Sequence, residues 1–271
     1  MMFLNELFSD PYILRALAVA SVAALLCAVV GVYVVVRGIS FAGDGLSHAS
    51  LAGAGFARLM AIPPLWGAVG YACFLSALIS RLGGGGKLRE DARLAVLFTG
   101  SMAVGFVLLS KQPGGALTGA LFGSLLPLGV NDVVAISAAA VLLLVSVKAL
   151  EKELLLVAVD EEFAAVTGVS PSRYLLVMDL AIAFTVVIAS KAVGVLLVSS
   201  LLVVPPSIAL VAVRDIGQAF SVSAGIGVAV SLIGVVLSVL LDTPPGATIA
   251  LVSAVVFIIF MAAHRFRGRR H

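Results

Sequence analysis

Asp44 and His48 stand in an otherwise apolar part of the chain, within the stretch Gly43–Gly53. His48 is the only histidine outside the C-terminal tail. Because the two residues are four positions apart, a helix would place them on one face, one turn from each other. A carboxylate and an imidazole in this arrangement can bind a divalent cation, relay a proton or hydrogen-bond to each other.

The composition shows what kind of protein holds this pair. Of 271 residues, 62% are hydrophobic and 11% are charged, with a mean hydropathy of +1.21. A soluble chain carries about 25% charged residues, so this one is expected to be an integral membrane protein. Long apolar runs without strict alternation predict helices and not an outer-membrane barrel. We therefore expect an all-α polytopic bundle that forms a single transmembrane domain over residues 1–271.

The apolar runs predict about eight to nine transmembrane helices. They are Tyr12–Val36, Phe41–Ala61, Leu65–Ile79, Leu94–Leu109, Val133–Val147, Tyr174–Ser190, Ala192–Val213, Ala219–Leu241 and Ala247–Ala263. Ala116–Leu128 is too short to span and predicts a re-entrant or interfacial helix. A tight hairpin is expected to turn at Ser190–Lys191.

The distribution of basic residues predicts the orientation in the membrane. The tail 264–271 is strongly basic, and cytoplasmic segments carry an excess of Lys and Arg. With the tail in the cytoplasm, counting back along the spans places most of the 17 Lys and Arg residues on the same side. The exceptions are Arg15, Arg58, Lys111 and Lys191. A chain with nine crossings would then begin outside.

Two interpretations of Asp44 and His48 remain open from the residues alone. An ionisable group within a bilayer costs about 2.5–3.5 kcal/mol on insertion scales, so the pair needs an explanation. Asp44 could be the N-cap of a helix, with His48 as an interior hydrogen-bonding partner. Alternatively, the pair is a cation site, where nearby glycines, Gly43, Gly45 and Gly53, allow close backbone approach or local unwinding. Oxygen plus imidazole suits zinc, manganese or ferrous iron without selecting one.

A short amphipathic helix is expected within residues 151–173, inside the longest polar interruption of the chain. Asp160 would cap this helix and Gly168 would end it. Phe163 and Val166 are three residues apart and share one face. The segment is either an interfacial loop or a docking helix for a soluble partner. In the second interpretation the contact residues are Glu161, Glu162, Phe163, Val166 and Gly168.

Two proline-containing segments could shape the pathway. Pro205 and Pro206 lie inside an apolar run, where they interrupt helical hydrogen bonds and predict either a packing kink or a gating element. Hydroxyl groups of Ser199, Ser200 and Ser207 could satisfy the freed carbonyls. Asp242–Gly246 predicts a rigid turn at the outer mouth, where Asp242 either attracts cations or caps a helix.

Motifs for catalysis are missing from the sequence. Gly83–Lys87 has the glycines of a phosphate loop, but Leu88 occupies the position that needs Ser or Thr. Neither a Gly-x-Ser-x-Gly nor a His-Glu-x-x-His motif occurs. We therefore do not expect the chain to be an enzyme, and energy for any transport would come from elsewhere.

Taken together, these segments resemble the integral-membrane permease of the ABC importers for zinc, manganese and iron. Four stretches match in the family's order, namely residues 43–53, 120–126, 191–205 and 242–246. The acidic helix falls where that family has its ATPase-facing segment. The match extends over nearly the whole chain, and the first stretch is the most specific.

The resemblance implies a homodimeric permease in a prokaryotic cell membrane, surrounded by lipid, with its C-terminus in the cytoplasm. Its expected partners are a cytoplasmic ATP-binding subunit and an extracytoplasmic metal-binding protein that docks near Pro113–Gly115 and Asp242. No nucleic acid and no permanently bound cofactor are expected. Asp44 and His48 would contact the metal ion in transit.

Two alternatives to this function stay open. In a proton-coupled secondary metal carrier, Asp44 and His48 would relay protons and no ATPase would be needed. An ABC permease for a metal chelate would share the architecture. Residues 97–102 contain no histidine, whereas some zinc-type relatives carry one there, so the resemblance does not select the metal.

Overall fold

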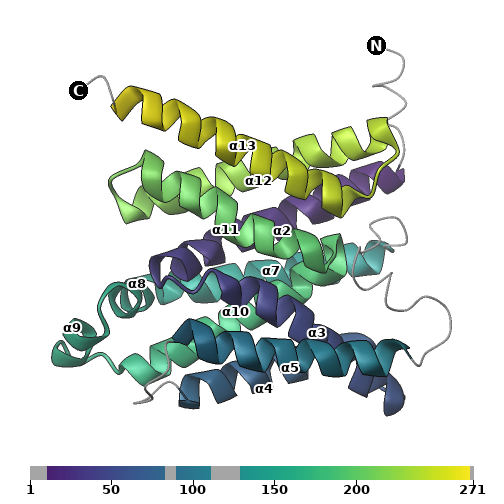
Figure 1. Cartoon of the computed structure of the whole chain (residues 1–271), viewed down its shortest axis with the longest axis horizontal. Helices are drawn as coiled ribbons and strands as arrows, with labels where there is room; N and C mark the ends of the chain where they lie inside the picture. The colour runs from purple at the N-terminus through teal and green to yellow at the C-terminus, as the bar shows by residue number, and fades with distance from the viewer. Residues whose placement is uncertain (1–10, 83–89, 111–128, 269–271) are drawn as a thin grey trace.

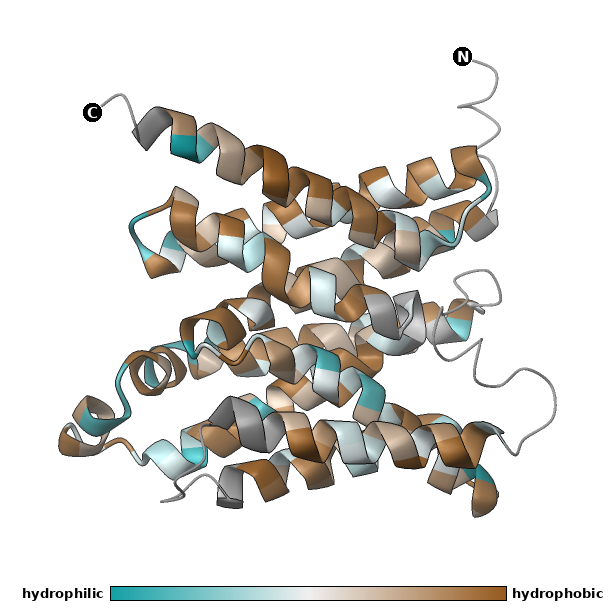
Figure 2. Cartoon of the chain, in the orientation of Figure 1, coloured by the Kyte–Doolittle hydropathy of each residue, from teal (hydrophilic) through white to brown (hydrophobic). Residues whose placement is uncertain are grey.

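The computed structural model describes residues 11–82, 90–110 and 129–268. Within these ranges the chain forms eleven α-helices and no strand, which confirms the all-α fold. The helices are packed side by side in one bundle (Figure 1). Hydrophobic residues cover most of their surfaces, and hydrophilic residues gather mainly near helix ends and turns (Figure 2).

Most of the predicted spans correspond to a helix. In chain order the helices are α2 (Pro11–Val36), α3 (Phe41–Leu59), α4 (Pro64–Leu82), α5 (Glu90–Ser110), α7 (Val130–Ala149), α8 (Glu151–Val159), α9 (Glu161–Val166), α10 (Pro171–Val193), α11 (Val195–Ala212), α12 (Ile216–Leu241) and α13 (Pro245–Gly268). The predicted re-entrant segment 116–128 and the predicted docking residues 113–115 lie outside the described ranges.

Length and hydropathy identify fewer crossings than the sequence prediction. Within the described part of the chain, four helices, α2, α10, α12 and α13, are long and apolar enough to span a membrane, and α7 with α8 would make a fifth if that bent pair is one span. Apolar parts of α4, α5 and α11 are shorter than a full crossing. α3 is not in either group, yet most of its residues are buried by other helices.

Short connections fix the relative directions of neighbouring helices. Four residues join α2 to α3 and four join α3 to α4, while Gly194 alone separates α10 from α11. Such short connections force consecutive helices to run in opposite directions. As a result, α8, α9 and the C-terminal end of α13 lie at one end of the bundle, and the α12–α13 turn lies at the other (Figure 1).

Helix α2 occupies the centre of the bundle. It packs against α10, α11 and α12, and also contacts α7 and α8. Ala20, Ala23 and Ala24 on this helix are fully buried, and such small side chains let helix backbones approach closely. Ser223 Oγ of α12 donates a hydrogen bond to the Ala28 carbonyl at 2.8 Å. This contact satisfies a buried hydroxyl at the helix interface.

The predicted hairpin turn was wrong by a few residues. α10 continues through Ser190 to Val193, and the chain turns at Gly194, whose φ is +91°. Only glycine adopts this conformation without strain, so backbone conformation decides the position of the turn. The charge of Lys191 does not end the helix.

Both prolines lie inside α11, as predicted. Pro206 has no N–H, so the Leu202 carbonyl one turn earlier loses its helical donor. That carbonyl packs directly against Gly31 of α2, where any Cβ would collide with it. Ser207 Oγ donates instead to the Val203 carbonyl at 2.6 Å. The Leu202 carbonyl therefore packs against the backbone of α2, and the Ser207 hydroxyl does not bind it.

The polar interruption contains a helix that the sequence analysis missed. α8 follows α7 with a bend of 69°, and Lys148 pairs with Glu151 across the junction. Leu154 and Val157 of α8 are buried, each 1% exposed. The first turn of α8 holds three charged residues. Because spans were predicted from long uncharged runs, this helix was not predicted.

Candidate functional site

Helix α3 carries both Asp44 and His48. Ser40 occupies the N-cap position, whereas Asp44 is the fourth residue of the helix. Asp44 therefore does not cap the helix, and the capping interpretation was wrong. α3 packs mainly against α4, α5, α10 and α11, so the pair is held on a helix that other helices surround.

The structure brings a third residue to the pair. Oδ1 of Asp44 lies 3.6 Å from Nε2 of His48 and accepts a hydrogen bond from Ser199 Oγ at 3.0 Å. The Asp44 side chain is 46% exposed and the His48 side chain 15%. Among the described groups, His48 Nδ1 is buried without a hydrogen-bond partner. Ser199 belongs to α11, so α3 and α11 build the site together.

These distances leave Asp44 and His48 able to share a cation. A distance of 3.6 Å exceeds the usual hydrogen-bond range of about 2.7–3.2 Å, so the imidazole is not tightly bound to the carboxylate. Two ligand atoms about 2.1 Å from one ion at a tetrahedral angle lie about 3.4 Å apart. The observed separation is close to that value. A small movement of either side chain would therefore give a two-ligand site.

The hydrogen-bond partner of Ser199 differs from the predicted one. The position of Ser199 in the sequence suggested a hydrogen bond to backbone carbonyls freed by the prolines, but its hydroxyl donates to Asp44. By contrast, Ser47 and Ser50 on α3 donate to carbonyls of their own helix, those of Gly43 and Ser47. The Ser199 contact fixes one carboxylate oxygen of Asp44, and among the described residues no side chain donates a hydrogen bond to the other oxygen.

Gly45 allows α5 to approach the site. A Cβ on Gly45 would collide with the ring of Phe98, which is itself 5% exposed. α3 is a continuous helix from Phe41 to Leu59, so the suggestion that glycines unwind the helix here was wrong. The glycines serve close packing, which the sequence analysis gave as the other possibility.

One copy of the chain offers an incomplete metal site. In the described residues, no group of three or more His, Cys, Asp and Glu side chains is arranged to hold a metal ion. Divalent transition metals take four or more ligands in stable sites. Asp44 and His48 alone therefore suit transient contact with a passing ion.

A buried ion pair near the site was not predicted. Arg37, directly after α2, meets Asp179 of α10 with Nη1 and Oδ1 2.6 Å apart. The sequence did contain a signal, because Asp179 is a single acid within an apolar run and such a residue needs a partner. No local pattern identifies that partner, which is 142 positions away.

The short helix predicted within residues 151–173 is present as α9. Asp160 caps it by accepting a hydrogen bond from the Phe163 N–H at 2.9 Å, and Gly168 follows it with φ +89°. Ala164 is buried, while Phe163 and Val166 are 57% and 87% exposed. α9 projects at one extremity of the bundle (Figure 1). An apolar face uncovered at an extremity suits a partner surface.

Asp242 does not join Asp44 and His48. It ends α12 in the left-handed conformation, with φ 51° and ψ 47°, and is exposed in the turn that leads into α13. The hydroxyls of Thr243 and Thr248 hydrogen-bond to each other at 2.8 Å. The predicted rigid turn is therefore present, at a position separate from the α3 site.

The family model of the ABC 3 transport family matches residues 9–264. The chain belongs to the ABC 3 transport family. This family model spans every helix described above except the last residues of α13. It includes the α3 pair and the exposed helix α9.

Several relatives of this ABC 3 family chain are similar over almost their whole length. A protein of Haemophilus influenzae named as a probable iron transport system membrane protein is 32% identical, covering 98% of this chain and 99% of the relative. The chelated iron transport system membrane protein YfeD of Yersinia pestis is 30% identical, with coverages of 94% and 86%. The manganese transport system membrane protein MntC of Halalkalibacterium halodurans is 27% identical, with coverages of 95% and 89%.

A solved structure confirms the ABC permease fold. PsaBC from Streptococcus pneumoniae, solved in complex with a Fab, superposes with a TM-score of 0.86 at 23% sequence identity. The superposition covers 96% of this chain and 94% of the PsaBC chain. This ABC 3 family member is therefore a membrane protein with the ABC permease fold.

Proposed function

We propose that this chain is the permease subunit of an ATP-driven importer that carries a divalent transition-metal ion into the cytoplasm by alternating access. The observation that carries the proposal is the contact set around Asp44, in a chain of the ABC 3 transport family. His48 stands 3.6 Å from the carboxylate and Ser199 donates to it. A weak site of this kind suits an ion that must leave again.

The cargo is manganese or ferrous iron in preference to zinc. Relatives that align along nearly the whole chain are named for manganese and iron transport. Asp44 and His48 supply one hard oxygen and one borderline nitrogen ligand, a combination that both metals accept. One relative is named for chelated iron, so an iron chelate is the second candidate cargo. The family assignment favours ATP-driven transport over a proton-coupled carrier.

The site is completed by a second copy of the chain. A single copy brings two ligands, so a homodimer with its α3 helices facing the same pathway would offer four, which is enough for a transition metal. An extracytoplasmic metal-binding protein delivers the ion at the end that holds the Asp242 turn. A cytoplasmic ATP-binding subunit docks on α9 through Glu161, Glu162, Phe163, Val166 and Gly168. Pro205 and Pro206 give α11 its gating role.

The proposed topology has nine crossings, formed by α2, α3, α4, α5, α7 with α8, α10, α11, α12 and α13. Short connections between consecutive helices support it. α9 and the C-terminal end of α13 lie at one end of the bundle (Figure 1), and that end is cytoplasmic by the positive-inside rule. Of the helices too short for a full crossing, α3 and α11 are largely covered by their neighbours, so these two need not match the bilayer thickness.

The experiment measures cellular uptake of manganese and iron by Asp44→Ala and His48→Ala variants. Each is expected to abolish uptake while the permease still assembles with its ATPase. Ser50→Ala is the matched control, because Ser50 lies on the same helix and bonds only to the Ser47 carbonyl. Wild-type uptake of both metals in both variants would disprove the site. Parallel assays with free ions and an iron chelate distinguish the two cargoes.

A further inference from the structure

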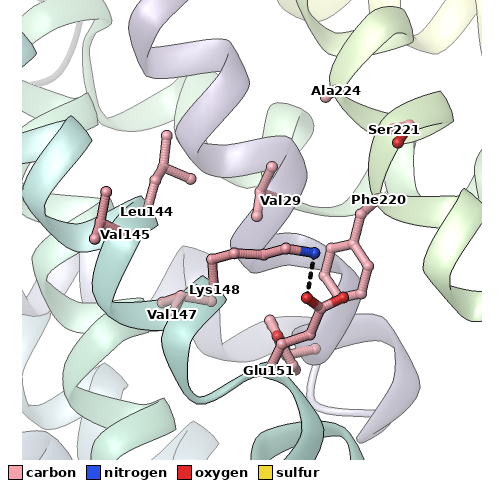
Figure 3. Close-up of a pocket in the computed structure, with 10 residues that line it drawn as sticks. Val29, Leu144, Val145, Val147, Lys148, Glu151, Phe220, Ser221 and Ala224 are labelled. Carbon is pink, nitrogen blue, oxygen red and sulfur yellow. Dashed lines mark ion pairs between the residues drawn. The ribbon is translucent and has the colours of Figure 1, made fainter.

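A cavity of the molecule is lined by residues outside the α3 site. It has a volume of about 400 Å³ and is bordered by α2, α7, α8 and α12 (Figure 3). Small-molecule sites commonly have volumes of about 300–1,000 Å³. Most of the wall is apolar, with Val29, Leu144 and Phe220 among the lining residues. The cavity is therefore large enough to hold part of an acyl chain.

Two charges of opposite sign lie side by side at this cavity. Lys148, from the last turn of α7, points its ammonium group towards the carboxylate of Glu151, the first residue of α8 (Figure 3). The Lys148 side chain is largely exposed, whereas that of Glu151 is mostly covered. The cavity thus offers one positive and one negative group to a ligand.

A third polar group of the wall is buried without a partner. Tyr33 is 2% exposed, and within the described part of the chain its hydroxyl has no hydrogen-bond partner. The Phe220 ring packs on the Tyr33 ring with centroids 5.2 Å apart, which limits movement of the phenol. A buried hydroxyl that forms no hydrogen bond is unfavourable. An acceptor atom from a ligand would relieve this cost.

The lining residues locate the cavity along the length of the bundle. Tyr33 is in the last turn of α2, Lys148 in the last turn of α7, and Phe220 in the second turn of α12. The cavity is therefore close to the ends of three helices, at the end of the bundle that carries α8 and α9. Val145 of the wall is exposed on the outside of α7, so acyl chains of the surrounding lipid can reach it.

We propose that this cavity binds a phospholipid with a zwitterionic, primary-amine headgroup, of the phosphatidylethanolamine class. The Lys148 ammonium faces the lipid phosphate, and the Glu151 carboxylate accepts hydrogen bonds from the lipid amine. Tyr33 Oη donates to an ester carbonyl, and the apolar wall holds an acyl chain. An anionic headgroup would place its charge beside Glu151, and a choline headgroup has no N–H to donate.

Lipid binding to the full-length permease, purified together with its partner subunits, tests this proposal by native mass spectrometry. Phosphatidylethanolamine, phosphatidylglycerol and phosphatidylcholine are added separately after delipidation. Phosphatidylethanolamine should be retained best. Ala224→Phe, which fills the cavity from α12, should lower its retention about tenfold, equivalent to about 1.4 kcal/mol. Ala254→Phe is the matched control on the exposed surface of α13 and should behave as wild type.

A second variant keeps the shape of the cavity. Glu151→Gln removes the negative charge and should reduce the preference for phosphatidylethanolamine over phosphatidylglycerol, even if Ala224→Phe fails to fold. Equal retention of the three lipids by the wild-type protein would overturn the proposal. A disulfide cross-link between two copies of the Ala224→Cys variant would also overturn the proposal, because a second copy would then cover the cavity.

Discussion

Nη1 of Arg37 lies 2.6 Å from Oδ1 of Asp179, and the two side chains are only 7% and 11% exposed. The sulfur of Met178 lies 3.7 Å from the same nitrogen. Arg37 directly precedes the turn into α3, and Asp179 lies in α10, which follows α9 in the chain. The ion pair therefore links the turn that leads into α3, the helix of the proposed metal site, to α10, the helix that follows the proposed docking segment.

Loss of this buried carboxylate should destabilise the protein. Asp179→Ala deprives the buried guanidinium of its facing carboxylate, which costs about 3–5 kcal/mol for a buried pair. The expected result is a clearly lower midpoint of thermal unfolding in detergent. Lys148→Ala is the control, because the Lys148 side chain is largely exposed and an exposed charge contributes about 0–1 kcal/mol to an ion pair. Equal midpoints for the two variants would show that the Arg37–Asp179 pair adds little.

A double replacement separates charge from packing at the same position. Arg37→Met with Asp179→Leu removes both charges and keeps similar volume, and such replacements of buried pairs are often neutral or stabilising. Most of the stability lost in Asp179→Ala should return. If the double variant is less stable than Asp179→Ala, other contacts of these residues outweigh the ion pair.

Gly45 should not tolerate a side chain. Its Cβ position is occupied by the Phe98 ring, so Gly45→Ala forces a shift between α3 and α5 that costs about 1–3 kcal/mol. Gly70→Ala is the matched control within α4, because no atom lies within 4 Å of that Cβ position. Glycine costs about 0.5–1 kcal/mol relative to alanine in a helix, so the control should gain stability. Thermal unfolding of both variants checks the contrast.

The sequence predicted the local features of the site and missed its long-range contacts. The spacing of Asp44 and His48 was enough to place them on one helical face, and the cap at Asp160 was enough to place α9. Ser199 is 155 positions from Asp44, so no local pattern connects them. Likewise, Arg37 and Asp179 meet only because α2 and α10 pack together.

Helix boundaries were predicted less well where a charged residue suggested one boundary and the backbone conformation or packing set another. Lys191 suggested a turn, but the positive φ of Gly194 is what reverses the chain. The charges at the start of α8 suggested a loop, although its buried Leu154 and Val157 hold a helix in place. Hydropathy marks apolar runs, while tertiary packing decides where each helix ends.

Ser199→Ala should weaken transport through its effect on Asp44. Loss of a hydrogen bond to a charged group costs about 1.5–3 kcal/mol, so metal uptake should fall about tenfold or more. Ser199→Thr keeps the hydroxyl and should restore most of the uptake. Ser200→Ala, the neighbouring hydroxyl on α11, is the matched control. Uptake by Ser199→Ala at the wild-type rate would mean that Asp44 does not depend on this contact.

The exposed face of α9 should bind the ATPase. Phe163 is 57% exposed, so Phe163→Asp should leave the fold intact and place a charge where the partner needs an apolar surface. The ATP-binding subunit is then expected to be lost on co-purification. Phe266→Asp is the matched control, because Phe266 is 71% exposed on α13 at the same end of the bundle. If the Phe163→Asp complex survives with ATP hydrolysis still coupled to metal uptake, α9 is not the docking helix.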